Sequence, residues 1–159
     1  MLSPSIPEVA GLVLFLLACY GVAWFGARFR PDAWYGRLAK PAWTPPNWIF
    51  APVWSVLYTA MAVAGWLVWR EAGVAGALGP LGLFALQLAL NGIWTWLFFG
   101  LHRPDWALAD IVALWVAIVV TVVSFWTVSP QAGALLLPYL VWVTFAGLLN
   151  VEIWRLNRG

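Results

Sequence analysis

Five long apolar runs dominate this chain of 159 residues and constrain its fold more than any other feature. They cover approximately residues 7–29, 48–69, 81–101, 106–128 and 133–154. A helix of about 20 residues crosses the hydrocarbon core of a bilayer, and the runs do not alternate between apolar and polar residues as membrane strands do. The runs therefore predict an all-α integral membrane protein, folded as a bundle of five transmembrane helices.

The composition leaves little for a domain outside the membrane. Charged residues make up 9% of the chain and its mean hydropathy is +0.88, whereas a soluble protein carries about 25% charged residues. We therefore expect a single domain over residues 1–159. The net charge is only +2, without a basic stripe, so nucleic acid is not an expected partner. The single cysteine, Cys19, excludes an intrachain disulfide.

The basic residues are distributed unevenly between the two sides that five spans create. Seven of the eight lie at or near loop one (residues 30–47), in the link after residue 101, or at the C-terminus, and only Arg70 lies on the other side. Positive residues favour the cytoplasmic side. This predicts an N-terminus outside, with loop one and the C-terminus in the cytoplasm, and leaves open which membrane holds the protein.

Polar residues inside the apolar runs are costly, and each requires a reason. Gln87 and Asn91 lie four residues apart and so share a helix face, where they either form hydrogen bonds between helices or face a ligand cavity. Asp110 lies close to the interface, where it either faces a ligand cavity or pairs with Arg103 or with a residue at the inner end of another helix. Pro138 lies inside the fifth run and predicts a kink there.

The side chains of conventional catalysis are missing from the sequence. It has one histidine, His102, and no cluster of cysteine, histidine or acidic residues at the spacing of a metal site. His102 is either a solvated loop residue or an axial ligand of haem. No phosphate-binding glycine loop or nucleophile elbow is present. We therefore expect neither a metal nor a resident cofactor, and a conventional enzyme is disfavoured.

The stretch KPAWTPPNWIFAPVW, residues 40–54, combines three tryptophans with four prolines. Proline reduces the conformational freedom of a loop and suits the first turn of a helix, so we expect a helix to begin near Pro45, with Thr44 as its cap. Trp54 and Tyr58 then share one face, directed into the bundle. Aromatic walls of this kind suit a flat, apolar ligand such as a tetrapyrrole, a sterol or a planar drug.

This stretch also resembles the W-x-P-P-x-W signature of the TspO/MBR family, which contains the tryptophan-rich sensory proteins of bacteria and the mitochondrial translocator protein. The segments WYGRLAKPAW, PLGLFALQLALN, FFG, WALAD, VSP, PYLVW and LLNVEIWR resemble family segments in the family order, over nearly the whole chain. The resemblance implies a five-helix bundle, usually a homodimer, whose ligand pocket opens under loop one, with loop one as its lid. Family ligands are porphyrins such as protoporphyrin IX, haem, sterols such as cholesterol, and isoquinoline or benzodiazepine drugs.

The resemblance also assigns candidate site residues by position. Trp54 and Trp142 match the tryptophans implicated in light-dependent porphyrin breakdown in bacterial members, and they would be catalytic only if that activity exists here. Porphyrin or haem would be a ligand rather than a cofactor. Val151 replaces the tyrosine of the family's sterol motif, which argues against high-affinity sterol binding. The positions implied to line the pocket are Ala27, Trp43, Phe50, Ala51, Val53, Trp54, Asn91, Trp94, Trp106, Ala109, Ala113, Trp142, Ala146 and Leu149.

Three functions follow from the residues and the resemblance. The leading hypothesis is a membrane receptor or transporter that binds porphyrins and other flat hydrophobic ligands and regulates tetrapyrrole metabolism and the response to stress. The second is a catalyst of light-dependent porphyrin degradation that uses the paired tryptophans. The third is a scaffold that acts through protein partners, with the pocket as a regulatory site. The sequence leaves open the physiological ligand and the direction of any transport.

Overall fold

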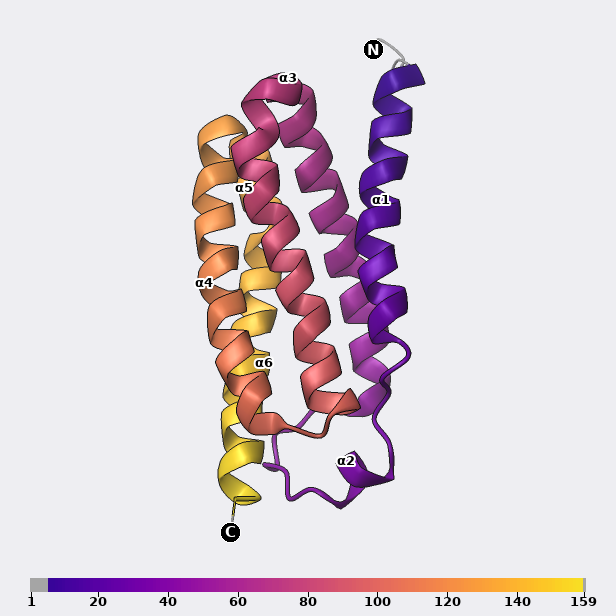
Figure 1. Cartoon of the computed structure of the whole chain (residues 1–159), viewed down its shortest axis with the longest axis vertical. Helices are drawn as coiled ribbons and strands as arrows, with labels where there is room; N and C mark the ends of the chain where they lie inside the picture. The colour runs from indigo at the N-terminus through magenta and orange to yellow at the C-terminus, as the bar shows by residue number, and fades with distance from the viewer. Residues whose placement is uncertain (1–5, 159) are drawn as a thin grey trace.

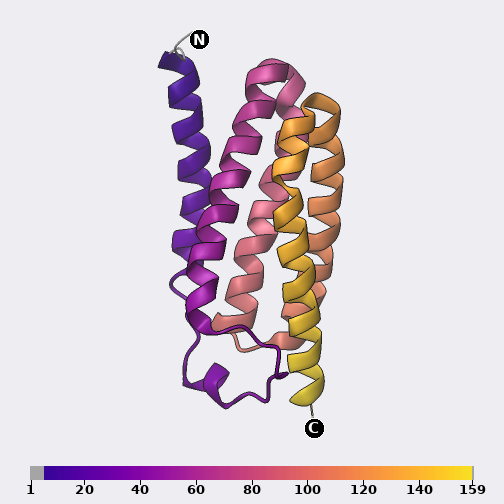
Figure 2. The same cartoon turned by 180° about the vertical axis from the view of Figure 1, so that it is seen from behind.

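The computed structural model describes residues 6–158, and the secondary-structure elements within that range are all helices. This confirms the predicted all-α class. The long helices lie side by side as one bundle, and loop one crosses the end of the bundle at which α6 finishes (Figures 1 and 2). The elements are α1 (Ile6–Gly26), α2 (Ala33–Arg37), η1 (Asn47–Ile49), α3 (Phe50–Thr95), η2 (Trp96–Gly100), α4 (Pro104–Val128), α5 (Pro130–Leu135) and α6 (Leu137–Leu156).

The element α3 is a helical hairpin rather than a single rod. Gly73 has φ 67° and ψ −179°, a positive-φ conformation that glycine adopts without a steric penalty. There the chain reverses, so that a first arm (residues 50–72) and a second arm (residues 74–95) run beside each other (Figures 1 and 2). The sequence predicted a loop over residues 70–80, but one glycine makes the turn and the residues around it are helical.

Several helical segments are long and apolar enough to cross a membrane. The second of them contains both arms of α3, so the predicted spans 48–69 and 81–101 fall within one continuous segment. Among the described residues there are four such segments, Ile6–Gly26, Asn47–Gly100, Pro104–Val128 and Pro130–Leu156.

Apolar side chains fill the centre of the bundle and also cover its outside. Met61, Ile118 and Tyr139 are at most 1% exposed in the core, whereas Val56 and Val141 on the outer faces are 67% and 69% exposed. A soluble protein does not keep apolar surface of this extent in water. The outer faces therefore meet lipid, and the chain is an integral membrane protein.

Proline sets the break between the last two helices. Pro138 lies in the first turn of α6, and the chain turns at Leu136, whose N–H bonds to the carbonyl oxygen of Gly133 at 3.1 Å. Proline has no N–H for the carbonyl of Ala134, and its ring clashes with a carbonyl at that position of a continuous helix. The kink predicted at Pro138 is therefore present, as a break two residues earlier.

A close approach of backbone and ring fixes α1 against the first arm of α3. A Cβ on Gly65 would lie 2.8 Å from Cδ1 of Phe15, so only glycine admits the ring at its present position. At the next residue of α3, Nε1 of Trp66 donates to the carbonyl oxygen of Glu8, seven residues before Phe15 on α1, at 2.9 Å. These contacts fix the orientation of α1 against α3, and so the position at which loop one begins at the end of the bundle.

Candidate ligand-binding site

An interior pocket lies at the loop-one end of the bundle, between α2, the two ends of α3, η2 and α6. Its walls are mainly aromatic, and its cavity volume is about 30 Å³, which holds about one water molecule. A ligand of the size of a porphyrin therefore requires the walls to move apart. The lining residues are Tyr35, Phe50, Trp94, Phe98, Phe99, Phe145, Ala146, Leu149, Asn150 and Ile153.

A π-helix, η2, brings two of these rings to the pocket. Phe98 stacks on Trp94 with 5.5 Å between ring centroids, and Phe99 meets Tyr35 of loop one edge to face at 5.4 Å. The extra residue in a π-helical turn changes the direction of the side chains that follow, and such turns often occur at functional sites. The sequence carried no signal for it, because the apolar run 81–101 is compatible with a regular α-helix.

Asn91 joins three helical segments in the core beneath the pocket. Its Oδ1 accepts a hydrogen bond from the Tyr58 hydroxyl at 2.6 Å, and its Nδ2 donates to the Tyr139 hydroxyl at 3.1 Å. All three side chains are buried. The arrangement matches the interhelical interpretation of Asn91, whose amide is engaged by protein on both sides. Gln87, one turn away, has a buried Oε1 without a hydrogen-bond partner among the described residues.

A second polar chain ties the pocket wall to the start of α4. Nε1 of Trp94 donates to Oδ1 of Asn150 at 3.1 Å, and Nδ2 of Asn150 donates to the carbonyl oxygen of Pro104 at 2.9 Å. Asn150 lines the pocket although it was absent from the implied site residues. Its position near the inner end of the fifth run was the only signal of its role.

Trp142 on α6 lies next to the pocket, whereas Trp54 on the first arm of α3 lies in the core beside Tyr58 and Tyr139. The Trp142 ring is 5.9 Å from Phe50 and 5.5 Å from Phe145, both of which line the cavity. The Trp54 ring lies deeper, 5.4 Å from the ring of Tyr58. Nε1 of Trp142 is buried and has no hydrogen-bond partner among the described residues.

The other implied pocket residues divide into two groups. Four of them, Phe50, Trp94, Ala146 and Leu149, line the cavity, and Trp43 lies beside it with its ring 5.6 Å from that of Phe145. Val53 packs against the core without lining the cavity. The remaining five are exposed on the outer surface of this structure, and these are Ala27, Ala51, Trp106, Ala109 and Ala113.

Asp110 does not pair with Arg103, and that part of the prediction is wrong. The Arg103 guanidinium binds Asp105, with Nη2 2.6 Å from Oδ2. Asp105 lies only two residues further along the chain, in the first turn of α4, and so reaches the guanidinium first. Oδ2 of Asp110 is buried without a hydrogen-bond partner in the described part of the chain.

Loop one covers the pocket and is held in place by several contacts. Tyr35 is buried, and the Lys40 ammonium donates to the carbonyl oxygens of Tyr35 at 2.6 Å and of Leu38 at 2.9 Å. Burial raises the pKa of the Tyr35 hydroxyl above its usual value. At the far side, the Asn157 amide makes two hydrogen bonds with the backbone of Ala39. The loop is therefore an ordered cover rather than a loose connection.

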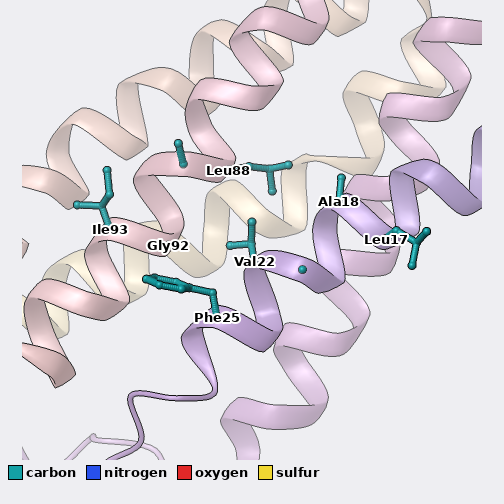
Figure 3. A pocket seen from close by; sticks show the side chains of 9 residues that line it. Leu17, Ala18, Val22, Phe25, Leu88, Gly92 and Ile93 are labelled. Carbon is teal, nitrogen blue, oxygen red and sulfur yellow. The ribbon is translucent and has the colours of Figure 1, made fainter.

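A larger hollow lies on the outside of the bundle and has a different character. It is an open groove of about 370 Å³ between α1 and the second arm of α3 (Figure 3). Its walls are apolar and include small residues on both helices. The groove can therefore accommodate an apolar surface, but it has no polar side chain to orient a small ligand. Its lining residues are Leu17, Ala18, Gly21, Val22, Phe25, Leu88, Ala89, Gly92 and Ile93.

Comparison with known proteins places the chain among tryptophan-rich membrane proteins. It is 41% identical to the translocator protein of Homo sapiens over 164 residues, which cover 100% of this chain and 95% of the relative. It is 43% identical over 150 residues to protein CrtK of Rhodobacter capsulatus, with 92% of each chain covered. It is 42% identical over 143 residues to the tryptophan-rich sensory protein of Cereibacter sphaeroides, with 90% and 89% covered. A sequence model of the TspO/MBR family matches residues 14–155, and the chain belongs to this family.

Proposed function

We propose that this protein is a membrane receptor for flat, hydrophobic ligands, with porphyrins such as protoporphyrin IX and haem as the principal class. Loop one is the lid of the binding pocket. Relatives that are named tryptophan-rich sensory protein and translocator protein support a sensory or translocating role. In that role, ligand occupancy would regulate tetrapyrrole metabolism and the response to stress. Sterols and isoquinoline or benzodiazepine drugs are further candidate ligands.

The aromatic wall of the pocket is the observation that carries this proposal. Rings from loop one, both ends of α3, η2 and α6 converge on one small cavity. Aromatic pairs contribute about 0.5–1.5 kcal/mol each beyond the area that they bury, and their flat faces select flat partners. The buried N–H of Trp142 adds a donor for a carboxylate or carbonyl group at the edge of such a ligand.

Binding requires the pocket to open. A cavity of about 30 Å³ is far below the roughly 300–1,000 Å³ of sites that hold drug-sized ligands. Loop one is the part of the wall that can lift, because the other lining residues lie on packed helices. The ligand therefore selects an open state in which loop one has lifted from the bundle.

Five membrane crossings are part of the proposal. Each arm of α3 on either side of Gly73 has about the 20 residues that a span needs, and the chain reverses between them. The uneven distribution of Lys and Arg then favours an N-terminus outside, with loop one and the C-terminus in the cytoplasm. The ligand pocket would face the cytoplasmic side.

A homodimer is the expected assembly, with the outer groove of Figure 3 as its seam. Small residues line both of its walls, Ala18 and Gly21 on α1, and Ala89 and Gly92 on α3. Rows of small residues allow helices in a membrane to approach closely. This surface is distinct from the ligand pocket, so assembly and ligand binding do not compete for the same residues.

A porphyrin titration tests the receptor function. The full chain in lipid nanodiscs is titrated with protoporphyrin IX in the dark, and quenching of tryptophan fluorescence is followed. We expect saturable quenching at micromolar concentration with the porphyrin recovered unchanged. Quenching that increases linearly without saturation would show that the pocket does not bind porphyrin. It would favour a scaffold that acts through protein partners.

Light-dependent porphyrin degradation is the second candidate, favoured by the contact of Trp142 with Phe50 of the cavity wall. Bound porphyrin would absorb light, and the indoles of Trp54 and Trp142 would stabilise or quench the radical products. The same titration is repeated under illumination with the native chain and with the double variant Trp54→Phe, Trp142→Phe. A new absorbing product that the double variant does not form supports this activity, and unchanged porphyrin in light excludes it.

A further inference from the structure

Besides its aromatic contacts, loop one meets the bundle through two polar contacts of different chemistry in the described part of the chain. At the first, the Asn157 amide accepts from the N–H of Ala39 at 3.0 Å and donates to the carbonyl oxygen of Ala39 at 2.9 Å. This contact is neutral. At the second, His102 in the link between η2 and α4 meets Asp32 and Trp34 of loop one. Only the second contact contains a type of side chain that changes charge near neutral pH.

The His102 contact combines an ion pair with a ring stack. Nε2 of His102 lies 3.2 Å from Oδ2 of Asp32, and the imidazole lies over the Trp34 ring with 4.3 Å between centroids and 16° between planes. Trp34 in turn meets Phe98 of the pocket wall at 6.0 Å. His102 has φ 54°, a left-handed conformation in which histidine is enriched relative to most side chains. The histidine therefore links the position of loop one to the pocket wall.

Asp32 is the acidic group that faces His102 from loop one. Its Oδ1 caps α2 by accepting from the N–H of Tyr35 at 3.1 Å, which leaves Oδ2 for the imidazole. The Tyr35 N–H, and after it the charge of His102, hold the pKa of Asp32 below its usual value. Asp32 is therefore ionised throughout the pH range in which a histidine changes charge. The other charged side chains of loop one are basic: Arg30 donates to the carbonyl oxygen of Ala27 at 3.1 Å, Lys40 donates to backbone carbonyls, and Arg37 lies in the last turn of α2.

Two ion pairs on the bundle side engage charged groups at this end of the molecule. Arg103, next to His102 in the chain, donates to Asp105 through two hydrogen bonds at 2.8 Å and 2.6 Å. On α6, Arg155 pairs with Glu152 at 2.9 Å. Within the described residues these pairs leave the carboxylate of loop one as the charged partner of the imidazole.

We propose that His102 is a proton-operated latch that closes loop one over the ligand pocket. A protonated imidazole is attracted to the carboxylate of Asp32 and to the face of the Trp34 ring. A neutral imidazole loses both attractions and keeps only its hydrogen bond and its stacking. Loop one therefore closes more tightly as the pH falls and the imidazole gains its proton, and it opens more readily as the pH rises. This inference rests on the proposed function only in treating loop one as the lid of a ligand pocket.

The expected effect is moderate because the contact is open to solvent. The side chains of His102 and Asp32 are 38% and 49% exposed, and an exposed ion pair changes an equilibrium by about two- to five-fold. A change of that size alters how often loop one opens without locking it. The latch would therefore set the rate at which a ligand enters and leaves the pocket.

Amide hydrogen exchange of loop one tests the latch directly and without any ligand. The full chain in nanodiscs is compared at about pH 5.5 and about pH 7.5, either side of the histidine range, after correction for the intrinsic exchange rates. We expect loop-one amides, including those of Tyr35 and Ala39, to be about two- to five-fold more protected at the lower pH. His102 is the single histidine of the sequence, so no other imidazole contributes to the response.

Two variants remove the latch while keeping the local backbone. His102→Asn removes the titrating ring but retains a residue that tolerates positive φ. Asp32→Asn removes the charge but retains an oxygen that caps α2. We expect both variants to show the same loop-one protection at the two pH values. Asn157→Ala, which removes the neutral contact, should lower protection at both pH values and leave the pH response intact.

The half-buried carboxyl of Asp110 provides the decisive control. Asp110→Asn should keep the full pH response, since this residue does not contact loop one through any of the bonds described above. A response that persists in His102→Asn, that disappears in Asp110→Asn, or that is absent from the native chain would overturn the latch. Because no ligand is present, each of these outcomes leaves the porphyrin titration to decide the proposed function separately.

Discussion

At the scale of single residues, Asn91 has the greatest structural consequence. It is 2% exposed, and its amide satisfies two tyrosine hydroxyls that are themselves buried, one on the first arm of α3 and one on α6. A buried polar group without a partner is costly, so the three side chains stabilise one another as a set. The network lies beneath the pocket and provides a fixed floor against which loop one and the aromatic rings can move.

Replacement of Asn91 should therefore destabilise the bundle. Asn91→Ala leaves the hydroxyls of Tyr58 and Tyr139 without their partner, and we expect a loss of about 1–3 kcal/mol in the free energy of unfolding. Unfolding in mixed micelles, followed by circular dichroism, measures the change. Thr127→Ala is the control, because that exposed hydroxyl bonds only to the carbonyl oxygen of Ser124. Equal stability of the two variants would show that the network contributes nothing.

At the scale of elements, the reversal of α3 depends on one backbone conformation. No heavy atom lies within 4 Å of the position that a Cβ on Gly73 would occupy, outside its own helix and chain neighbours, so the requirement for glycine comes from φ 67° alone. The predicted loop over residues 70–80 was too long because a turn of this kind needs no loop residues beyond the glycine. Hydropathy locates the polar residues of a sequence. A turn made by a single glycine needs no polar residue, so hydropathy does not locate it.

A pair of glycine variants tests the reversal. Gly73→Ala places a side chain at positive φ and should cost about 1–2 kcal/mol in the free energy of unfolding. Gly79→Ala is the matched control, since Gly79 lies in the same helix with open space around it and a helical backbone. The control should be neutral or stabilising by up to about 1 kcal/mol. Thermal unfolding of both variants in nanodiscs separates them, and the reverse order of stability would contradict the backbone argument.

Loop one should also respond to acid at its α2 cap. The pKa of Asp32 is held below its usual value in the folded loop, by the Tyr35 N–H first and by the charge of His102 after it. A carboxyl of this kind contributes stability above its ordinary pKa of about 3.9, and that stability is lost as the pH falls through the lower folded value. We expect loop-one amide protection to decrease below about pH 4. In Asp32→Asn, loop-one protection should not decrease in this acid range. The same decrease in the native chain and in the variant would show that a group other than Asp32 causes it.

At the scale of the whole molecule, hydropathy predicted the helices but not the faces that they present. The apolar runs located α1, both arms of α3, α4 and most of α5 and α6, because length and apolar character decide membrane insertion. Ala109 and Ala113, which the family resemblance implies for the pocket, are exposed on α4 in this structure. Lipid and protein core are equally apolar, so a pattern of apolar residues cannot distinguish the two sides of a membrane helix. The π-helix at Trp96–Gly100, which directs Phe98 and Phe99, also left no mark in the sequence.

The topology of the molecule can be tested with two single-cysteine variants. In a Cys19→Ala background, Gly36→Cys lies in loop one and Gly76→Cys lies next to the reversal of α3, both at exposed positions. Five spans place these residues on opposite sides of the membrane. A membrane-impermeant maleimide added to cells should therefore label position 76 and reach position 36 only after the cells are opened. Labelling of both from the same side would contradict the five-span topology.

The most direct test of the central claim is to fill the pocket and measure porphyrin binding. Ala146 lines the cavity, whereas Ala113 is exposed on the outer face of α4. The family resemblance implies both alanines for the pocket, and Ala146→Trp and Ala113→Trp enlarge the side chain by the same amount. Both variants are titrated with protoporphyrin IX in nanodiscs. We predict at least about a tenfold loss of affinity for Ala146→Trp, equal to about 1.4 kcal/mol, and no change for Ala113→Trp. Native affinity in Ala146→Trp together with lost affinity in Ala113→Trp would contradict the position of the site.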